Sequence, residues 1–423
     1  MFPEIQLKRL VDAARPITYG IVQAGPDEPG GVPYIRPVDM TKSNGVANYT
    51  ALQRTTKDIA KAYSRSIITA GDLVVSIGPS YGKIMVVPGE LSGANLTQGT
   101  ARVAAAAGVY NRFLFWALQT STARQFWDSC VGGATFRALN LEPLGRTPIS
   151  MPPSGDRRRI ADFLDTETGR IDALTNARSS QHQMLNEWWK SYLGASVQRL
   201  IDEYGTITLR RVVNSVEQGW SPQCDDTEAH PAEWAVLKTS AVSAGTFKPS
   251  EHKRLPVNIS PEMRYKIMDG DILMTRGSGS PEHVGVAAMA DTEGRSLLLS
   301  DLLYRIRVDQ AHWSPQFITL ALASNPIRGL VSLLFRGQSG QTIKLRSEDV
   351  KEIGIPAAPV TVQHLVSSDL MLVRNQIQNA QAAIGKSQAL LAERRQALIT
   401  AAVTGRFDVS SASGRGLTDG VPV

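Results

Sequence analysis

Two stretches of the chain follow the same plan, and this repetition decides the fold. Residues 66–90 read SIITAGDLVVSIGPSYGKIMVVPGE, and residues 265–291 read YKIMDGDILMTRGSGSPEHVGVAAMAD. Each stretch has a Gly-Asp pair, an apolar run, a turn rich in glycine and serine, and a second apolar run. Apolar runs on either side of such a turn are typical of a β-hairpin. The sequence therefore predicts the same hairpin in both halves of the chain.

The similarity between the halves continues after the hairpins. ANLTQGTARVAA around Gln98 corresponds to LLLSDLLYRIRVD around Asp301, and a helical stretch follows in each half. Gly-rich turns come next, at residues 132–135 and 336–340, and each leads to a short strand and a proline-rich stop. A long and weak internal repeat of this kind predicts two globular domains of one architecture.

After each proline-rich stop, apolar residues recur about every 3.5 positions, which is the spacing of a long helix that packs on another helix. Each helix is expected to run for about 35–40 residues. The first stripe is interrupted by polar residues and the second is cleaner. The first consists of Ile160, Leu164, Ile171, Leu174, Leu185, Trp188 and Tyr192, and the second of Val366, Leu370, Val373, Ile377, Ala380, Ile384, Leu391 and Leu398.

The expected architecture is α+β, with two globular domains that alternate with two long helices in a pseudo-two-fold repeat. The last segment is small and polar, and we expect it to be disordered. The boundaries that we assign are 1–153 for the first domain, 154–198 for the first helix, 199–356 for the second domain, 357–408 for the second helix and 409–423 for the tail.

The composition is that of a globular protein with a mild preference for polyanions, since the formal net charge is +6 and the pI is about 9.3. Cys130 and Cys224 lie far apart, which argues against a disulfide framework or a zinc site and indicates a reducing compartment. The N-terminus has no apolar leader, and no apolar stretch has the length of a membrane span. We therefore expect a cytoplasmic protein without a membrane partner.

The ordered set of motifs resembles the specificity subunits of type I restriction–modification systems. The resemblance spans nearly the whole chain and rests on GIVQAG at 20–25, GVPYIRPVDM at 31–40, GDLVVSIGPSYGKIMVV at 71–87, PISMPPSGDRRRIADFLDTETGRIDAL at 148–174 and LLAERRQALITAAVTGRFDV at 390–409. Such subunits usually have a Pro-Pro-Leu-x-Glu-Gln stretch before each helix. Here the two copies read PPSGDR and PAAPV, so this chain departs from the family pattern where each helix begins.

The resemblance implies that each globular domain is a target-recognition domain that reads one half of a split DNA site. It also implies that the two helices pack antiparallel as a coiled coil and hold the domains at a fixed separation. A split site needs a rigid spacer, because half-site spacing follows the helical repeat of DNA, about 34 Å per turn. The partners implied are double-stranded DNA, methyltransferase subunits and restriction subunits. Those subunits carry the AdoMet and ATP sites, so we expect no cofactor and no catalytic residue on this chain.

The turns of the two hairpins supply the first candidates for DNA contact. In the turn at 78–83, Lys83 is suited to phosphate, while Ser80 and Tyr81 are suited to base or sugar. The spacing of its glycines and the residue after the lysine exclude a P-loop. In the second turn, Arg276 is suited to guanine and Ser278 lies beside it. The alternative is a plain surface hairpin in each half.

Further candidates lie on the segments that the repeat places near these turns. We expect phosphate contacts from some of them and base contacts from Gln98 and Thr100. The alternative for Trp220 is partial burial at the edge of its domain. The remaining candidates are Arg36 and Lys42 after the strand GVPYIRP, their approximate counterparts Trp220 and Lys238, Arg137 after the first Gly-rich turn, and Lys344 in the matching strand of the second half.

Two other functions remain as alternatives. Glu251-His252-Lys253, with Asp226 upstream, contains part of a nuclease motif, but prolines flank it and no hairpin is evident. A coiled-coil scaffold without base readout would need only the long helices, where Trp188 and Tyr192 suit helix packing or a protein partner. The sequence has no methyltransferase motif and no histidine pair spaced for a metal, so DNA recognition without chemistry is the favoured interpretation.

Overall fold

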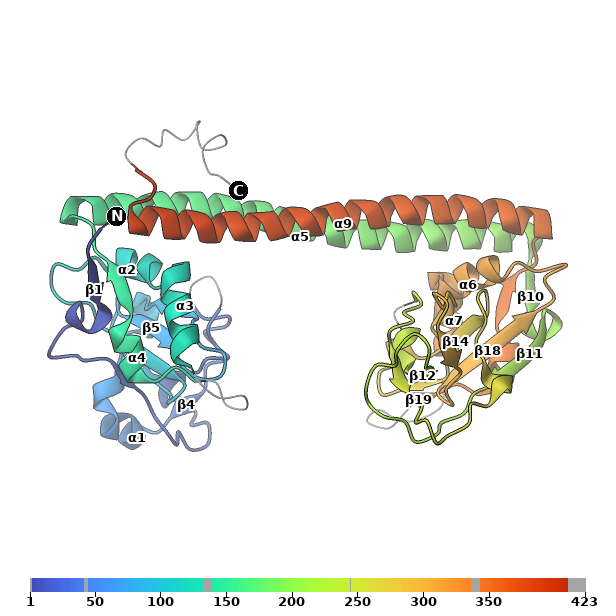
Figure 1. The fold of residues 1–423 in the computed structure, drawn as a ribbon, viewed down its shortest axis with the longest axis horizontal. Coiled ribbons are helices and arrows are strands. Elements are labelled where there is room, and N and C mark those ends of the chain that lie inside the picture. Colours follow the sequence, from blue (N-terminus) through green and yellow to red (C-terminus); the bar gives the residue numbers. More distant parts are fainter. Residues whose placement is uncertain (1, 42–44, 132–137, 244, 336–342, 410–423) are drawn as a thin grey trace. The chain divides into compact units, whose positions relative to one another are not determined.

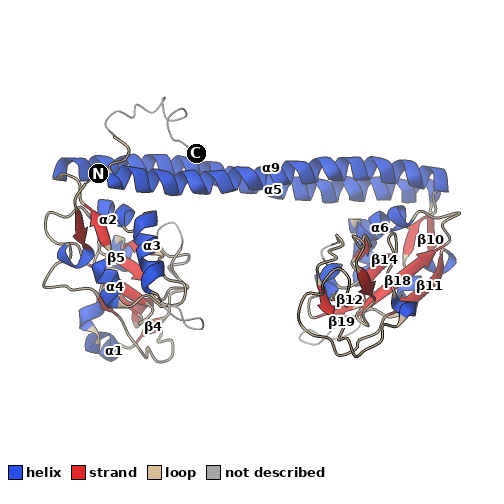
Figure 2. Ribbon diagram, viewed as in Figure 1, coloured by secondary structure: helices blue, strands red, loops and turns tan. Residues whose placement is uncertain are grey.

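The computed structural model describes residues 2–41, 45–131, 138–243, 245–335 and 343–409 of the chain. The chain divides into two compact units, which we call unit 1 (Met1–Arg178 and Gly385–Val423) and unit 2 (Ser179–Ile384). Two long helices, α5 (Ser154–Tyr204) and α9 (Val360–Thr404), each contribute residues to both units (Figure 1). Small sheets and short helices form the rest of each unit, so the chain has the mixed α and β character that the sequence predicts (Figure 2).

The sheets of unit 1 join strands that are distant in the sequence. One antiparallel sheet has the order β2-β8-β5-β6, and another sheet has the order β4-β3-β7, in which β3 and β7 are parallel. A third pair joins β1 to β9. The strands are β1 (Glu4–Gln6), β2 (Thr18–Tyr19), β3 (Val32–Ile35), β4 (Arg54–Thr55), β5 (Leu73–Ser76), β6 (Ile84–Val86), β7 (Asn95–Leu96), β8 (Thr100–Val103) and β9 (Pro148–Ser150).

Strand β5 is buried on both faces, as an uninterrupted apolar run predicts. Leu73 and Val75 pack in the main core cluster of unit 1, whereas Val74 packs in a second cluster with Met85 and Leu96. Successive side chains of a strand point to opposite faces, so this one strand supplies both clusters. The hairpin predicted for residues 66–90 is confirmed, because β5 pairs antiparallel with β6.

Short helices cover the main core cluster of unit 1. Helix α3 begins after the N-cap Thr120, whose hydroxyl accepts a hydrogen bond from the backbone N–H of Ala123. Its residue Trp127 is buried, and the indole Nε1 donates to Thr147 Oγ1 at 2.7 Å. The short helices are α1 (Lys57–Ala62), α2 (Asn111–Ala117), α3 (Ser121–Cys130) and α4 (Leu141–Arg146).

Unit 2 has the strand orders of unit 1. Its sheets run β11-β18-β14-β16 and β13-β12-β17, with β12 and β17 parallel, and β10 pairs with β20. A further pair joins β15 to β19. The strands are β10 (Thr206–Thr208), β11 (Val213–Gln218), β12 (Trp234–Leu237), β13 (His252–Arg254), β14 (Ile272–Thr275), β15 (Gly277–Ser278), β16 (Ala287–Met289), β17 (Ser296–Leu298), β18 (Leu303–Val308), β19 (Ile343–Lys344) and β20 (Gly354–Pro356).

The core of unit 2 is also divided by its central strand. Ile272 and Met274 of β14 pack in the main cluster, and Leu273 between them packs in a second one. The predicted second hairpin is confirmed, because β14 pairs antiparallel with β16. The short helices of unit 2 are α6 (Pro315–Ala323), α7 (Asn325–Ser332) and α8 (Ser347–Lys351).

Helix α5 has 51 residues and α9 has 45, more than the roughly 35–40 expected from the spacing of the apolar residues. Helix α5 continues to Tyr204 because Leu193, Val197 and Leu200 pack in the core of unit 2, beyond the stripe that the pattern marks. Three stripe residues differ from expectation, since Leu174, Trp188 and Ala380 are exposed on the helix surface.

Side-chain contacts join α5 to α9 within each unit. In unit 1, Arg395 Nε lies 3.3 Å from Asp172 Oδ1. In unit 2, Tyr192 donates to Asp369 at 3.0 Å, and Gln381 donates to Asn186 at 2.8 Å. From the first of these unit 2 pairs to the second, the residue number falls along α5 and rises along α9. Along the described residues, every helix is too short or too polar to cross a bilayer.

Candidate nucleic-acid interface

Hydrogen bonds within the β5–β6 hairpin fix the conformation of its tip. The Ser76 hydroxyl donates to Ser80 O and accepts from the backbone N–H of Lys83, both at 2.9 Å. Gly82 has a φ of 92°, a backbone conformation that residues other than glycine rarely adopt. The candidate Ser80 lies exposed at this tip.

Tyr81 faces the protein rather than the solvent, which corrects the expectation that it contacts base or sugar. Its side chain is only 7% exposed, and its hydroxyl donates to Asp128 Oδ1 on α3 at 2.6 Å. The guanidinium of Arg124, also on α3, lies 4.5 Å from the centre of the tyrosine ring. The reason is local, because α3 offers both an acceptor and a cation to the ring.

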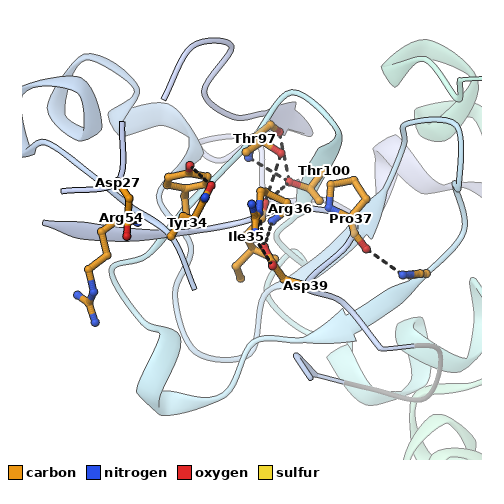
Figure 3. A network of polar contacts seen from close by, with 11 residues as sticks. Asp27, Tyr34, Ile35, Arg36, Pro37, Asp39, Arg54, Thr97 and Thr100 are labelled. Carbon is orange, nitrogen blue, oxygen red and sulfur yellow. Dashed lines mark hydrogen bonds and ion pairs between the residues drawn. The ribbon is translucent and has the colours of Figure 1, made fainter. Parts of the chain in front are cut away.

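Lys83 is partly exposed and is also bonded within the protein, so its phosphate contact stays a prediction. Its Nζ donates to the carbonyls of Pro37 and Met40, each at 2.9 Å. Those carbonyls belong to the loop after β3, where Arg36 lies. Arg36 forms an ion pair with Asp39 at 2.8 Å, and the hydrogen bond to Asp39 raises the pKa of this guanidinium (Figure 3). The charge of Arg36 is therefore balanced locally.

Thr100 is buried, which corrects the expectation that it reaches a base edge. Its hydroxyl donates to Ile35 O at 3.0 Å, and the Thr97 hydroxyl donates to the same carbonyl oxygen (Figure 3). Strand β8 begins at Thr100, and all its residues are buried. Gln98 precedes the strand and is exposed.

Three loops of unit 1 therefore meet at one place. Lys83 ties the hairpin tip to the loop after β3, and the backbone N–H groups of Ile77 and Gly78 both donate to Gly99 O. Among the candidates at this convergence, Ser80 and Gln98 are exposed, and Arg36 and Lys83 are partly exposed. Lys42 and Arg137 lie outside the described residues, so their roles stay predictions.

In unit 2, the β15–β19 ladder brings Arg276, Ser278 and Lys344 together. Gly277 is paired with Lys344, and the backbone N–H of Leu345 donates to Arg276 O at 2.8 Å. The Arg276 Nε donates to Tyr304 Oη at 3.2 Å, which orients the guanidinium. Ser278 Oγ accepts from a backbone N–H of the same turn, and Lys344 is exposed.

Trp220 and Lys238 lie beside the β13-β12-β17 sheet of unit 2: Trp220 packs against the cluster that contains Val236 of β12, and Lys238 follows β12. Trp220 is partly buried and stacks on Tyr265, with 6.4 Å between ring centres, so partial burial is the structural role of its ring. Lys238 Nζ lies 3.6 Å from Asp226 Oδ1, and Lys253 Nζ lies 3.5 Å from the same atom. Lys253 and then Lys238 lower the pKa of Asp226.

The residues of the partial nuclease motif are used for structure. The buried His252 accepts at Nε2 from the backbone N–H of Ala229 at 3.0 Å, so its Nδ1 donates to Pro249 O at 2.7 Å. Glu251 accepts from the Ser240 hydroxyl at 2.5 Å. Within the described ranges, no group of three or more His, Cys, Asp or Glu side chains is arranged to hold a metal ion.

Sequence reasoning missed an arginine that holds the hairpin tip in each unit. Arg124 Nη1 donates to Tyr81 O at 2.9 Å, and Arg328 Nη1 donates to Val284 O at 2.9 Å. Each carbonyl precedes a glycine of positive φ, 92° at Gly82 and 67° at Gly285. The signal was present in the sequence, because each arginine comes four residues after the N-cap of its helix, in TSTAR and SNPIR.

A comparison with models of known protein families gives a match in the N-terminal half of the chain, mostly within unit 1. The family model described as the type I restriction modification DNA specificity domain matches residues 21–181. The match includes the three converging loops and the beginning of α5. Residues 21–181 are therefore similar to a DNA specificity domain of this class.

The chain is also similar in sequence to individual specificity subunits. The type I restriction enzyme EcoEI specificity subunit of Escherichia coli is 29% identical over 187 residues, which cover 43% of this chain and 31% of that protein. The EcoKI specificity subunit of Escherichia coli strain K12 is 25% identical over 315 residues, which cover 69% of this chain and 66% of that protein. The matches thus span less than two thirds of each relative. The resemblance of the chain to type I specificity subunits is confirmed.

A solved structure shares the fold. Its subject is the complex assembly and conformational transition of the type I R-M system, and one of its chains aligns with a TM-score of 0.69. The alignment covers 96% of this chain and 100% of that chain at 15% identity. At this identity the likeness concerns the fold alone.

Proposed function

We propose that this chain is the DNA-recognition subunit of a type I restriction–modification complex and that it reads a bipartite, asymmetric site. The observation that carries the proposal is the match of residues 21–181 to the DNA specificity domain model, together with the recurrence of the strand orders of unit 1 in unit 2. Two domains of one architecture with different loops suit a site whose halves differ in sequence.

In this proposal, residues 1–153 and 199–356 are target-recognition domains, and residues 154–198 and 357–408 are spacer helices packed antiparallel as a coiled coil. The opposed order of the contacts between α5 and α9 in unit 2 supports the antiparallel arrangement. The recurring hairpin tip, with its arginine and positive-φ glycine, supports an internal repeat.

Base readout in unit 2 is assigned to Arg276 and Ser278, and a phosphate contact is assigned to Lys344. An arginine that presents two N–H groups to O6 and N7 is the commonest specific contact to guanine. In unit 1 we assign base or sugar contacts to Ser80 and Gln98, because both are exposed where three loops converge. Phosphate contacts supply most of the salt-dependent affinity in such interfaces.

We further propose that the chain performs no chemistry and that methyltransferase and restriction subunits bound to it carry out methylation and cleavage. A set of exposed apolar side chains on α5 and α9 of unit 2 suits a protein partner. The set consists of Met184, Trp188, Leu365 and Leu372.

Selection from a random duplex library tests the proposal, with the chain alone and in complex with a co-expressed methyltransferase subunit. We expect a consensus of two short blocks separated by a fixed, unspecified gap. A single ungapped block would contradict the bipartite site. A soluble, assembled complex that enriches no sequence would favour the scaffold function instead. Cleavage of a plasmid by the purified chain with magnesium would overturn the non-catalytic assignment.

A further inference from the structure

A hollow of about 270 Å³ lies in unit 2 beside helix α9. Its lining is mainly apolar and includes Phe247, Met289, Leu320 and Met371. One charged side chain, Arg374 of α9, completes it. Methionine side chains are flexible and polarisable, so a lining of this kind adapts to apolar groups of different shape.

Arg374 has no carboxylate partner in the described part of the chain. Its Nη2 donates to Thr246 Oγ1 at 3.0 Å, and its guanidinium lies 5.4 Å from the ring centre of Trp189. Burial lowers the pKa of this arginine, and no acidic group offsets the loss of solvent. A guanidinium has five N–H donors, so most of those on Arg374 have no protein acceptor among the described residues and are open to solvent or a ligand.

The corresponding place in unit 1 has a buried indole and an ion pair. Counted from the first residue of each helix, Leu320 of α6 matches Trp116 of α2, and Met371 of α9 matches Asp165 of α5. Asp165 accepts from Trp116 Nε1 at 2.8 Å and pairs with Arg112 at 2.7 Å. At these two positions unit 1 has an indole and a carboxylate, whereas unit 2 has Leu320 and Met371, which line the hollow.

We propose that the hollow is a docking site for an acidic–apolar segment of a protein partner. An aromatic or long aliphatic side chain of the partner enters the hollow, and a neighbouring carboxylate pairs with Arg374. Charge complementarity selects the carboxylate, since a bidentate pair satisfies the guanidinium. The apolar lining and the single cation disfavour a nucleic-acid backbone, which needs a basic groove. This site is separate from the residues assigned to DNA reading.

The test uses the full chain and a random twelve-residue peptide library displayed on phage. We expect enrichment of peptides in which Asp or Glu lies within two positions of Phe, Leu or Met. Fluorescence anisotropy of the enriched peptides then compares the wild type with Arg374→Gln and Leu320→Trp, the second of which introduces the indole of unit 1. Each substitution should weaken binding by about tenfold or more. Arg211→Gln, at an exposed arginine of unit 2 outside the lining, is the matched control.

Equal binding to wild type and both variants would overturn the site, and so would enrichment without acidic residues. The wild-type chain gives a readout that does not depend on the variants folding. Phenylpropanoate should displace a bound peptide, and its neutral amide should do so about tenfold less well, because only the acid pairs with Arg374. Sedimentation that shows self-association abolished by Arg374→Gln would identify a second copy of the chain as occupant and overturn the choice of partner.

Discussion

Two buried arginines at the centre of the sheets have different partners. Arg305 of β18 donates to Glu217 at 2.9 Å, and the register places these two residues opposite each other. Arg102 of β8 lies opposite Thr18 instead. Its Nη1 donates to Ile67 O at 2.8 Å, but its Nε is buried without a partner in the described structure. Unit 1 therefore bears the cost of a buried cation that unit 2 offsets with a carboxylate.

We expect Glu217→Gln to destabilise unit 2 in a pH-dependent way. Burial raises the pKa of Glu217, but hydrogen bonds from Arg305 and Ser215 together lower it further, so its pKa in the folded state is depressed. Its contribution is present above the unfolded pKa of about 4.3 and is lost as pH falls through the folded value. At pH 7 we expect a loss of about 1–2 kcal/mol, moderated by the exposure of Glu217. Urea unfolding at pH 7 and pH 3 checks this, since the two proteins should converge in acid.

The reciprocal change, Thr18→Glu, should stabilise unit 1. The desolvation of Arg102 is already present in the fold, so an opposing carboxylate adds an interaction worth about 1 kcal/mol. Thr18→Gln, which adds a similar volume without charge, is the control. Thermal unfolding at pH 7 measures both. A glutamate variant no more stable than the glutamine variant would show that the carboxylate does not reach Arg102.

Arg276→Ala should relax base preference in one half-site and leave the other unchanged. The expected loss of discrimination is about 1–3 kcal/mol at the affected position, the range for a bidentate contact to guanine. Lys344→Ala, on the paired strand, is the matched control and should weaken binding to all sequences while reducing the salt slope by about one. Binding measured on a panel of single-base changes at two salt concentrations separates the two effects. Uniform weakening by Arg276→Ala would remove it from base readout.

At the scale of elements, the hairpin tips depend on helices that come later in the sequence. Arg124 of α3 and Arg328 of α7 each hold the carbonyl before a positive-φ glycine. A Cβ atom at Gly285 would lie 2.7 Å from Val331 Cγ1, so the helix also restricts which residue the turn accepts. Each tip is therefore set by a tertiary contact.

Arg328→Ala should loosen the second tip and leave the first unchanged, and Arg124→Ala should do the reverse. Hydrogen exchange of the backbone amides at 282–286 and at 80–84 measures this directly. The amides of Gly285 and Gly82 donate to Thr275 O and Ser76 O, and we expect their protection to fall about tenfold in the matching variant. Lysine in place of Arg328 keeps the charge and serves as the control. Unchanged exchange in both tips would show that the arginines do not hold them.

The strands and long helices were predictable because the spacing of apolar residues along the sequence indicates them. The apolar run of Leu73–Ser76 and the 3.5-residue stripe of α5 each indicate their element without tertiary information. The orientation of single candidates was not predictable. Tyr81 and Lys83 turn inward because α3 and the loop after β3 supply their acceptors, and a strand that starts at Thr100 buries the hydroxyl expected at the surface. Such partners are distant in sequence, so local patterns do not indicate them.

At the scale of the whole molecule, the proposed function requires two readers that act independently. Unit 1 and unit 2 have the same strand orders and the same arginine-held tip, but their loops differ in sequence. If each unit reads its own half-site, a change in one tip affects one block of the recognised sequence. Independence of this kind is a thermodynamic property that a double-mutant cycle measures.

We therefore expect the effects of Arg124→Ala and Arg328→Ala on specific DNA binding to add. Each single variant should broaden one block of the selected consensus, and the double variant should broaden both. Its loss of binding free energy should equal the sum of the single losses within about 0.3–0.5 kcal/mol, as for sites without shared partners. Titration of a fluorescent duplex carrying the selected site, at one fixed salt concentration, supplies the four affinities of the cycle. A coupling energy well above that range would mean that the two tips contact a common segment of DNA, and the chain would then read one continuous site.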